Sequence, residues 1–246
     1  MHYDILKIKI TGKCNRNCAF CVFHAADCEM DKETYLRFLD KSTAIDFDSF
    51  HINGGEPMLH KDFTDICKIT REKFFKKKLV LGTNAILFEN KKMRDVVLET
   101  FNEICIGCDD EHNNISYIKK WLPEMIANSN ILFIINSLNG YTSDEIFEDL
   151  ENLRSQYPER IILVRNDVHH LEEGYSPHKL TGLCKQNNKQ VIMVDELGNV
   201  YRCFNSKVPD DVEFNFFDED AIEKLNTPRD FHYKYCPFCP LYFPVV

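Results

Sequence analysis

Apolar and polar positions alternate along the first two thirds of the chain with two different periods. Short runs with the alternation of strands cover residues 5–10, 49–53, 78–83, 103–107, 131–136 and 160–165. Between them, apolar residues recur at three- and four-residue steps, which predicts helices near 32–43, 61–75, 90–99, 114–127 and 143–155. Six β–α repeats in a row predict a parallel sheet with helices on its outside. Six repeats rather than eight predict an open, partial (β/α)6 barrel of the α/β class.

Two of the predicted helices begin at residues that favour N-caps. Asp62 precedes the second helix, and Ser143 precedes the fifth, which has Asp144 and Glu145 in its first turn. Side-chain oxygens of Asp and Ser accept hydrogen bonds from the free N–H groups of a first helical turn, and acidic residues there are favoured by the helix dipole. We therefore expect both residues to cap their helices.

The pattern changes after about residue 176. A hairpin is predicted from residues 190–195 and 200–203, because the Gly198-Asn turn between these apolar runs supplies positive φ. A short helix follows it. The chain is therefore divided into a barrel, residues 1–175, and a small C-terminal α+β appendage of β-hairpin plus helix that is rich in cysteine, residues 176–246.

The composition narrows the class of protein. The chain has 246 residues and a formal net charge of −9, which disfavours nucleic acid as a partner bound through bulk charge. No apolar run approaches the roughly 20 residues that span a bilayer. The N-terminus lacks the basic and apolar regions of a signal peptide, so a cytoplasmic protein is expected. Eleven cysteines in such a chain indicate metal binding or catalysis rather than disulfides.

Three of these cysteines stand close together after the first predicted strand. Cys14, Cys18 and Cys21 have the spacing C-x3-C-x2-C. Thiolates are the usual protein ligands of iron–sulfur clusters, and three of them on one loop hold three irons of a [4Fe–4S] cube. The fourth iron then keeps an open position for a substrate or cofactor. The alternative is a zinc site whose fourth ligand lies elsewhere in the chain.

A second motif ends the second predicted strand. Gly54, Gly55, Glu56 and Pro57 follow residues 50–53. Glycines permit close approach of a backbone and unusual φ angles, and proline stiffens the exit. The alternative is an ordinary turn with a surface glutamate. Together with the upstream cysteine triplet, this segment resembles the radical S-adenosylmethionine (SAM) superfamily.

The resemblance implies which residues contact SAM. In that family a GGEP-like segment receives the amino group of the SAM methionine, which assigns Gly54, Gly55, Glu56 and Pro57 to cofactor binding. Phe20 of the cysteine loop and three residues at strand ends are assigned with them: Thr83, Asn84 and Asn136. Thr and Asn at strand ends equally often cap the following loop. The family frequently has a serine where this chain has Gly107, which puts a SAM contact there in doubt.

The C-terminal cysteines form a second set. Cys184, Cys203, Cys236 and Cys239 are arranged as C-x13-G-x4-C followed by C-x2-C. This resembles the twitch domain, the shortened form of the SPASM appendage, which holds one auxiliary [4Fe–4S] cluster. A structural zinc site with four cysteine ligands is the alternative.

Other candidate catalytic residues have open roles. Arg165 ends the sixth predicted strand and either positions SAM or substrate or faces solvent or a helix. Cys108 lies near the barrel mouth and is a candidate for facing the substrate, and because Cys105 is three residues away in a strand, the two point to opposite faces. His169 and His170 are candidates for acid–base groups, with solvated side chains as the alternative.

The resemblance implies a radical SAM oxidoreductase. Reductive cleavage of SAM yields a 5′-deoxyadenosyl radical, which removes a hydrogen atom from the substrate, and an auxiliary cluster accepts the second electron. Enzymes of the 2-deoxy-scyllo-inosamine dehydrogenase type suggest a small polyol or sugar as substrate. Peptide maturation, nucleotide modification and a non-catalytic zinc protein are the alternatives. Flavodoxin or ferredoxin is expected as the external reductant, and no membrane partner is expected.

Overall fold

The computed structural model describes residues 1–21, 27–167, 191–201 and 212–227. Its strands are β1 (His2–Lys9), β2 (Asp46–Asn53), β3 (Lys78–Thr83), β4 (Glu103–Gly107), β5 (Leu132–Asn139), β6 (Ile161–Asp167), β7 (Val191–Val194), β8 (Asn199–Tyr201) and β9 (Val212–Asn215). Its α-helices are α1 (Lys32–Ser42), α2 (Phe63–Lys73), α3 (Lys91–Thr100), α4 (Ile115–Ala127), α5 (Asp144–Gln156) and α7 (Ala221–Asn226). Short 3-10 turns, η1 (Pro57–Leu59) and η2 (Ile86–Glu89), follow β2 and β3.

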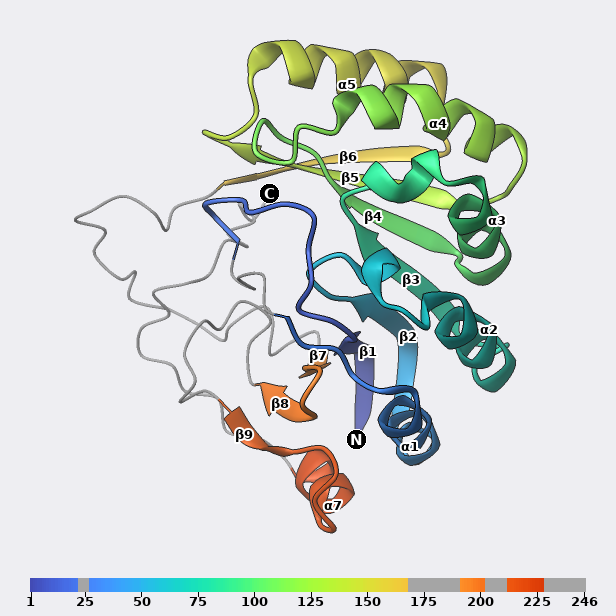
Figure 1. The fold of residues 1–246 in the computed structure, drawn as a ribbon, viewed down its shortest axis with the longest axis vertical. Coiled ribbons are helices and arrows are strands. Elements are labelled where there is room, and N and C mark those ends of the chain that lie inside the picture. The colour runs from blue at the N-terminus through green and yellow to red at the C-terminus, as the bar shows by residue number, and fades with distance from the viewer. Residues whose placement is uncertain (22–26, 168–190, 202–211, 228–246) are drawn as a thin grey trace, which may run out of the picture.

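The described strands form one nine-stranded sheet in the order β6-β5-β4-β3-β2-β1-β7-β8-β9. Every pair from β6 across to β7 is parallel, and the β7–β8 and β8–β9 pairs are antiparallel. Helices α1 to α5 cover the outer face of the curved sheet (Figure 1). The predicted α/β fold, a partial parallel barrel, is confirmed, and the six barrel strands fall where the apolar runs place them.

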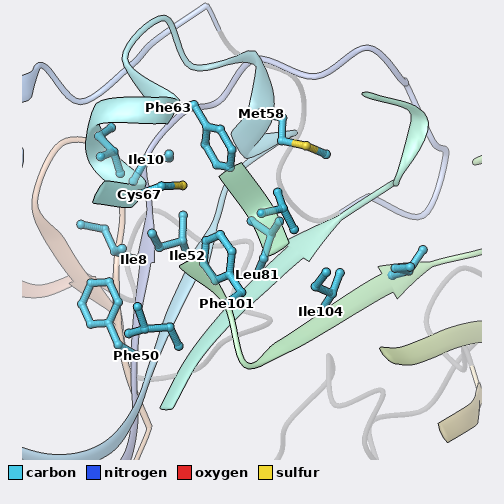
Figure 2. Packing of buried hydrophobic residues seen from close by; sticks show 14 of the residues in the cluster. Ile8, Ile10, Phe50, Ile52, Met58, Phe63, Cys67, Leu81, Phe101 and Ile104 are labelled. Carbon is cyan, nitrogen blue, oxygen red and sulfur yellow. The ribbon is translucent and has the colours of Figure 1, made fainter. Parts of the chain in front are cut away.

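The hydrophobic core lies between the sheet and its outer helices. Alternate residues of neighbouring strands, such as Ile8, Ile52 and Leu81, are fully buried there and pack against Phe63 and Cys67 of α2 (Figure 2). Because successive side chains of a strand point to opposite faces, the intervening residues lie on the inner, concave face.

The concave face has polar residues where the outer face is apolar. Lys7 of β1 and Cys105 of β4 are sequence neighbours of the core residues Ile8 and Ile104, so strand alternation places both on the inner side of the curve. The charge of Lys7 opposes the burial that raises the pKa of Cys105. Burial lowers the pKa of Lys7 to about 7. His51 of β2 lies beside Lys7 in register, and burial lowers its pKa to about 3. A packed barrel interior is mostly branched and apolar, so the polar composition of this face differs from that of a closed, packed barrel.

The predicted N-cap positions are confirmed, but the predicted side-chain hydrogen bonds are not. Asp62 and Ser143 do occupy the N-cap positions of α2 and α5, but neither side chain accepts a hydrogen bond from its helix. The Ser143 hydroxyl instead donates to Asp110, 3.0 Å away. The side-chain caps that the structure does show are Asp31 on α1 and Asn90 on α3. At Ser143, a tertiary contact therefore takes the place of the local cap.

The elements after residue 190 continue the barrel sheet. Strand β7 pairs with β1 from Ile5↔Val191 to Ile8↔Val194. The hairpin prediction is confirmed in its described part, since β7 and β8 are antiparallel and Gly198 has φ +83° in the turn. The division at residue 175 stays a prediction. No helix in the described ranges is long and apolar enough to cross a bilayer.

Phe216 attaches this C-terminal part to the barrel. Its ring is fully buried with its centroid 4.6 Å from that of Phe38 in α1. We expect Phe216→Ala to lower the free energy of unfolding by about 3–5 kcal/mol, as for other buried phenylalanines. Phe75→Ala is the matched control, because that ring is 67% exposed, and it should change stability little. Urea unfolding of both variants measures the difference, and equal effects would contradict the assignment.

Candidate functional site at the carboxyl edge of the sheet

The Gly-Gly segment after β2 packs directly against the start of the cysteine loop. The Gly55 N–H donates to the Thr11 carbonyl at 2.8 Å, and the Glu56 N–H donates to the Lys13 carbonyl at 2.7 Å. A Cβ on Gly55 would lie 2.4 Å from the Lys13 oxygen and 2.6 Å from the Gly12 oxygen. Neither Gly54 nor Gly55 has a positive φ, so a special backbone conformation is not what requires glycine here. The glycines are required because two backbones touch.

Glu56 joins the ends of β2 and β3. It is fully buried, and its carboxylate accepts hydrogen bonds from the Thr83 hydroxyl at 2.9 and 3.0 Å and from the Asn84 N–H at 2.8 Å. Burial raises the pKa of Glu56 to about 7, although the bonds from Asn84, Thr83 and Met58 oppose the shift. The alternative of a surface glutamate is therefore wrong. Contacts of Glu56 and Thr83 with SAM stay predictions.

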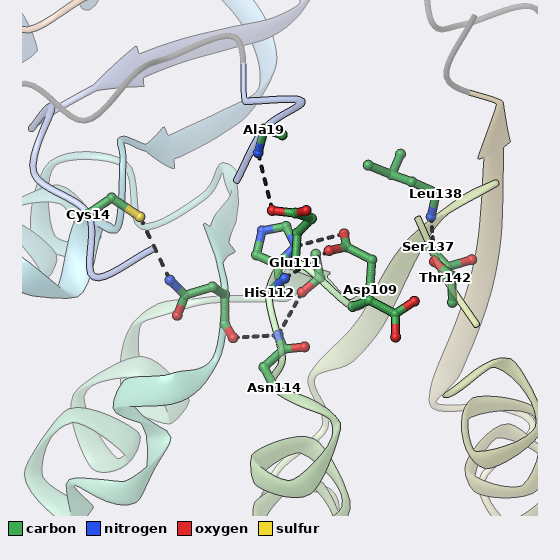
Figure 3. Close-up of polar contacts among 12 residues, drawn as sticks. Cys14, Ala19, Asp109, Glu111, His112, Asn114, Ser137, Leu138 and Thr142 are labelled. Atoms are coloured by element: carbon green, nitrogen blue, oxygen red, sulfur yellow. Dashed lines mark hydrogen bonds and ion pairs between the residues drawn. The ribbon is translucent and has the colours of Figure 1, made fainter. Parts of the chain in front are cut away.

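Asn84 connects β3 to the cysteine loop. Its side-chain amide donates to Asn15 Oδ1 at 2.7 Å and lies 4.0 Å from Cys14 Sγ. The backbone carbonyl of Asn84 accepts a hydrogen bond at 2.6 Å from the side-chain amide of Asn114. The same amide also donates to the Gly107 backbone carbonyl at 2.7 Å (Figure 3). The carboxyl ends of β3 and β4 are thereby fixed relative to the loop.

The three cysteines of the loop lie near enough to influence one another electrostatically. Burial raises the pKa of Cys14, and the negative charges of Glu56, Cys21 and Cys18 raise it further. The loop turns tightly, since the Cys21 N–H donates to the Cys18 carbonyl at 3.0 Å. Thiolates repel one another, and a cationic iron centre offsets that repulsion, so a loop with three cysteines matches a cluster with one open iron. The donor set fits a [4Fe–4S] cluster.

His112 is a site residue that the sequence analysis missed. Its Nδ1 lies 2.7 Å from a carboxylate oxygen of the fully buried Asp109, in the loop after β4. Burial alone would lower the pKa of His112, but the bonds to Asp109 and Cys18 raise it to about 9. The ring also explains Gly107, because a Cβ there would lie 2.9 Å from His112 Cε1. Glycine at this position therefore makes room for the histidine.

Phe20 lies against this histidine. Its ring centroid is 5.6 Å from that of His112 and 5.1 Å from that of Tyr141, with the latter pair edge to face. The Ala19 N–H also donates to Glu111 at 3.3 Å (Figure 3). The cysteine loop is thus held against the loop after β4 as well as against β2 and β3.

Other predicted residues are placed differently. Asn136 pairs with Gly107 in register at the same edge, on the concave side. Pro57 is buried at the start of η1. Cys108 is fully buried in the core cluster with Ile106, and burial raises the pKa of its thiol to about 12. A catalytic role for Cys108 stays a prediction that this position does not favour.

Arg165 also points away from the concave face. Its guanidinium lies 4.5 Å from the ring centroid of Phe147 in α5, on the outer side of the sheet. This position favours the helix-facing alternative over a contact with SAM or substrate. The predicted residues Cys184, Cys203, Cys236, Cys239, His169 and His170 lie outside the described residues.

Gly55→Ala should prevent assembly of the cysteine loop. The added methyl group meets two backbone oxygens that cannot turn aside, so we expect loss of iron from reconstituted protein and a destabilisation of several kcal/mol, on the order of overpacked cores. Gly140→Ala is the control. Gly140 has φ +82°, but the space around it is open. Gly140→Ala should therefore lower the free energy of unfolding by only about 1–2 kcal/mol and retain the iron. Equal iron contents would contradict this account.

Glu56 should make stability depend on pH in the apo protein. Because its pKa is raised from 4.5 to about 7, the folded state holds a proton that the unfolded state releases, and this contribution is lost as pH rises from about 4.5 through about 7. Glu56→Gln imitates the protonated side chain. The difference in unfolding free energy, wild type minus Glu56→Gln, should therefore be larger at pH 5 than at pH 7.5. A constant difference in urea unfolding would refute the shift.

Comparison with known proteins agrees with this geometry. Curated relatives include a probable GTP 3′,8-cyclase of Methanocaldococcus jannaschii, 34% identical over 160 residues, and a GTP 3′,8-cyclase of Clostridium perfringens (strain 13 / Type A), 28% identical over 174 residues. The alignments cover 58% and 63% of this chain and 53% of each relative. The chain therefore spans about half the length of these relatives.

Solved structures share the fold. The crystal structure of BtrN in complex with AdoMet and 2-DOIA has a TM-score of 0.55 at 16% identity, covering 92% of this chain and 83% of that one. Native anSMEcpe with bound AdoMet and Cp18Cys peptide has a TM-score of 0.61 at 15% identity, covering 89% and 81%. A sequence model of the radical SAM superfamily matches residues 8–170, which include the cysteine loop and the Gly-Gly segment. The chain belongs to the radical SAM superfamily.

Proposed function

We propose that this chain binds a [4Fe–4S] cluster through Cys14, Cys18 and Cys21, binds SAM beside it, and removes a hydrogen atom from a small polar substrate. The observation that carries the proposal is the placement of a loop with three cysteines at the carboxyl edge of a curved parallel sheet, next to the buried Glu56. Membership of the superfamily and solved neighbours with AdoMet bound support it. When bound, the cluster supplies the electron that cleaves SAM to methionine and a 5′-deoxyadenosyl radical.

The surrounding residues hold and tune the loop. The Arg16 N–H donates to Cys14 Sγ at 3.4 Å, and the Asn84 amide approaches the same sulfur. Hydrogen bonds to cluster sulfurs adjust the reduction potential. Phe20, Gly54, Gly55, Pro57 and Asn136 are the proposed SAM contacts together with Glu56, Thr83 and Asn84.

A nucleotide is the substrate that we propose first. The support is the similarity to GTP 3′,8-cyclases, which the sequence analysis placed behind a polyol. The polar concave face, with Lys7, Lys9 and His51 on its inner side, suits a ligand with many hydrogen-bonding groups.

Two-electron oxidation of a small alcohol is the second candidate. Cys184, Cys203, Cys236 and Cys239 supply a complete ligand set for an auxiliary [4Fe–4S] cluster, which would accept the second electron. An external one-electron reductant, such as flavodoxin or ferredoxin, is part of either proposal.

Removing one loop cysteine tests the first cluster. Cys18→Ala should abolish production of 5′-deoxyadenosine from SAM and remove about four irons per chain after anaerobic reconstitution. Cys67→Ala is the matched control, because that thiol lies in the core under α2, and it should keep both properties. Chromatography of the products and iron analysis give the answer. Cleavage of SAM by the Cys18 variant would contradict the assignment.

Substrate identity is tested in the same assay. Wild-type protein is incubated with SAM, dithionite and either GTP or 2-deoxy-scyllo-inosamine, and the products are analysed by mass spectrometry. A new chromatographic peak with the mass of GTP would support the nucleotide proposal, because a cyclised product regains, as one electron from dithionite and one proton, the hydrogen atom that it loses to the 5′-deoxyadenosyl radical. Loss of two mass units from the aminocyclitol would support oxidation instead.

A further inference from the structure

A group of three polar side chains, the buried Lys9 and Glu196 and the partly buried Cys28, lies where β1 and β7 end. The Lys9 ammonium is 3.1 Å from Glu196 Oε1, and the Cys28 thiol donates to the same oxygen at 2.7 Å. Glu196 and Lys9 are each only 8% exposed. Burial and the Glu196 contact raise the pKa of Cys28 to about 11, so the thiol keeps its proton at neutral pH.

The second oxygen of Glu196 is not used within this group. Oε2 is buried and has no hydrogen-bond partner among the described residues. A buried carboxylate oxygen without a hydrogen-bond donor lowers the free energy of unfolding by about 1–3 kcal/mol or more, so such an atom calls for a specific explanation. A ligand that supplies an O–H or N–H donor would satisfy it.

The carboxylate is held rigidly in this position. Asp195 Oδ1 accepts bonds from the N–H groups of Leu197 at 2.9 Å and Asn199 at 2.8 Å, which fixes the turn on both sides of Glu196. On the other side, the Cys28 carbonyl accepts from the Gly12 N–H at 2.8 Å, so the thiol is anchored to the start of the cysteine loop. Preorganised acceptors of this kind recognise ligands at little entropic cost.

The group borders the concave face. Successive side chains of β1 point to opposite faces of the sheet. Ile8 and Ile10 point into the core, so Lys9 points to the inner side, as Lys7 does. The Lys9–Glu196 pair therefore lies at the inner, carboxyl edge of the sheet, one strand away from the Gly-Gly segment.

We propose that Glu196 is a substrate-recognition residue whose Oε2 accepts a hydrogen bond from a neutral hydroxyl or N–H group of the substrate. The charges of Lys9 and Glu196 cancel, and the Cys28 thiol is neutral. The subsite therefore selects a neutral donor, such as a sugar hydroxyl or a base N–H, and does not bind phosphate, because Oε2 only accepts hydrogen bonds and ionised phosphate oxygens are acceptors too. This inference rests on the proposed function, because it places the substrate on the concave face.

Equilibrium binding to Glu196→Gln tests the inference. In this variant the amide oxygen stays with Lys9 and Cys28, and the amide N–H groups then face the substrate donor. Titration calorimetry would use anaerobically reconstituted protein with SAM present and two probes rich in neutral donors, GTP and 2-deoxy-scyllo-inosamine. We expect at least tenfold weaker binding of whichever probe binds to the wild type, which corresponds to about 1.4 kcal/mol.

Two controls separate recognition from damage. Glu219→Gln changes an exposed glutamate in the same C-terminal part and should bind the probe as the wild type does. Iron content and circular dichroism of Glu196→Gln must equal those of the wild type. If that variant does not fold, Lys9→Met takes its place. It removes the ammonium group that holds the Glu196 carboxylate, and it should also weaken binding of the probe.

The outcomes distinguish this inference from the proposed function. Equal affinity of Glu196→Gln and the wild type would overturn the recognition role, and so would a wild-type protein that binds neither probe at millimolar concentration. Failure of the wild type to cleave SAM would instead overturn the proposed function.

Discussion

The contact between two backbones at Gly55 is the constraint on which the site depends. The N–H groups of Gly55 and Glu56 bond to carbonyls on both sides of Gly12, so the exits of β1 and β2 continue side by side beyond the sheet. Only a residue without a side chain permits that approach. The cysteine loop therefore starts from a fixed base, and the positions of its three thiols follow from the sheet.

From that base the site is built by side chains that each join two strand ends. Glu56 joins β2 to β3, and Asn114 joins β3 to β4. His112 adds a contact from the loop after β4 to Cys18. Each of these groups is largely buried, where a hydrogen bond is strong and its loss is costly. The edge of the sheet thus behaves as one network rather than as separate loops.

The barrel strands, the outer helices and the two motifs are predictable from the sequence because each depends on local spacing. His112 and Glu196 are not, since their surroundings are made by loops and turns that meet only in the folded chain. The sequence does carry one signal of the polar inner face: Lys7 and Lys9 occupy one face of an otherwise apolar first strand. The same alternation separates Cys105 from Cys108, and the structure places Cys105 on the inner face.

The pairing of β7 with β1 has a consequence for synthesis of the chain. One edge of β1 is covered by β2 early, but its other edge is covered only when residues 191–194 have been made. Until then a strand at the centre of the final sheet has an open row of N–H and C=O groups, which invites pairing with other chains. Lys7 and Lys9 of β1 place positive charges along this unpaired strand, and such charges discourage pairing with other chains while the ribosome completes the protein.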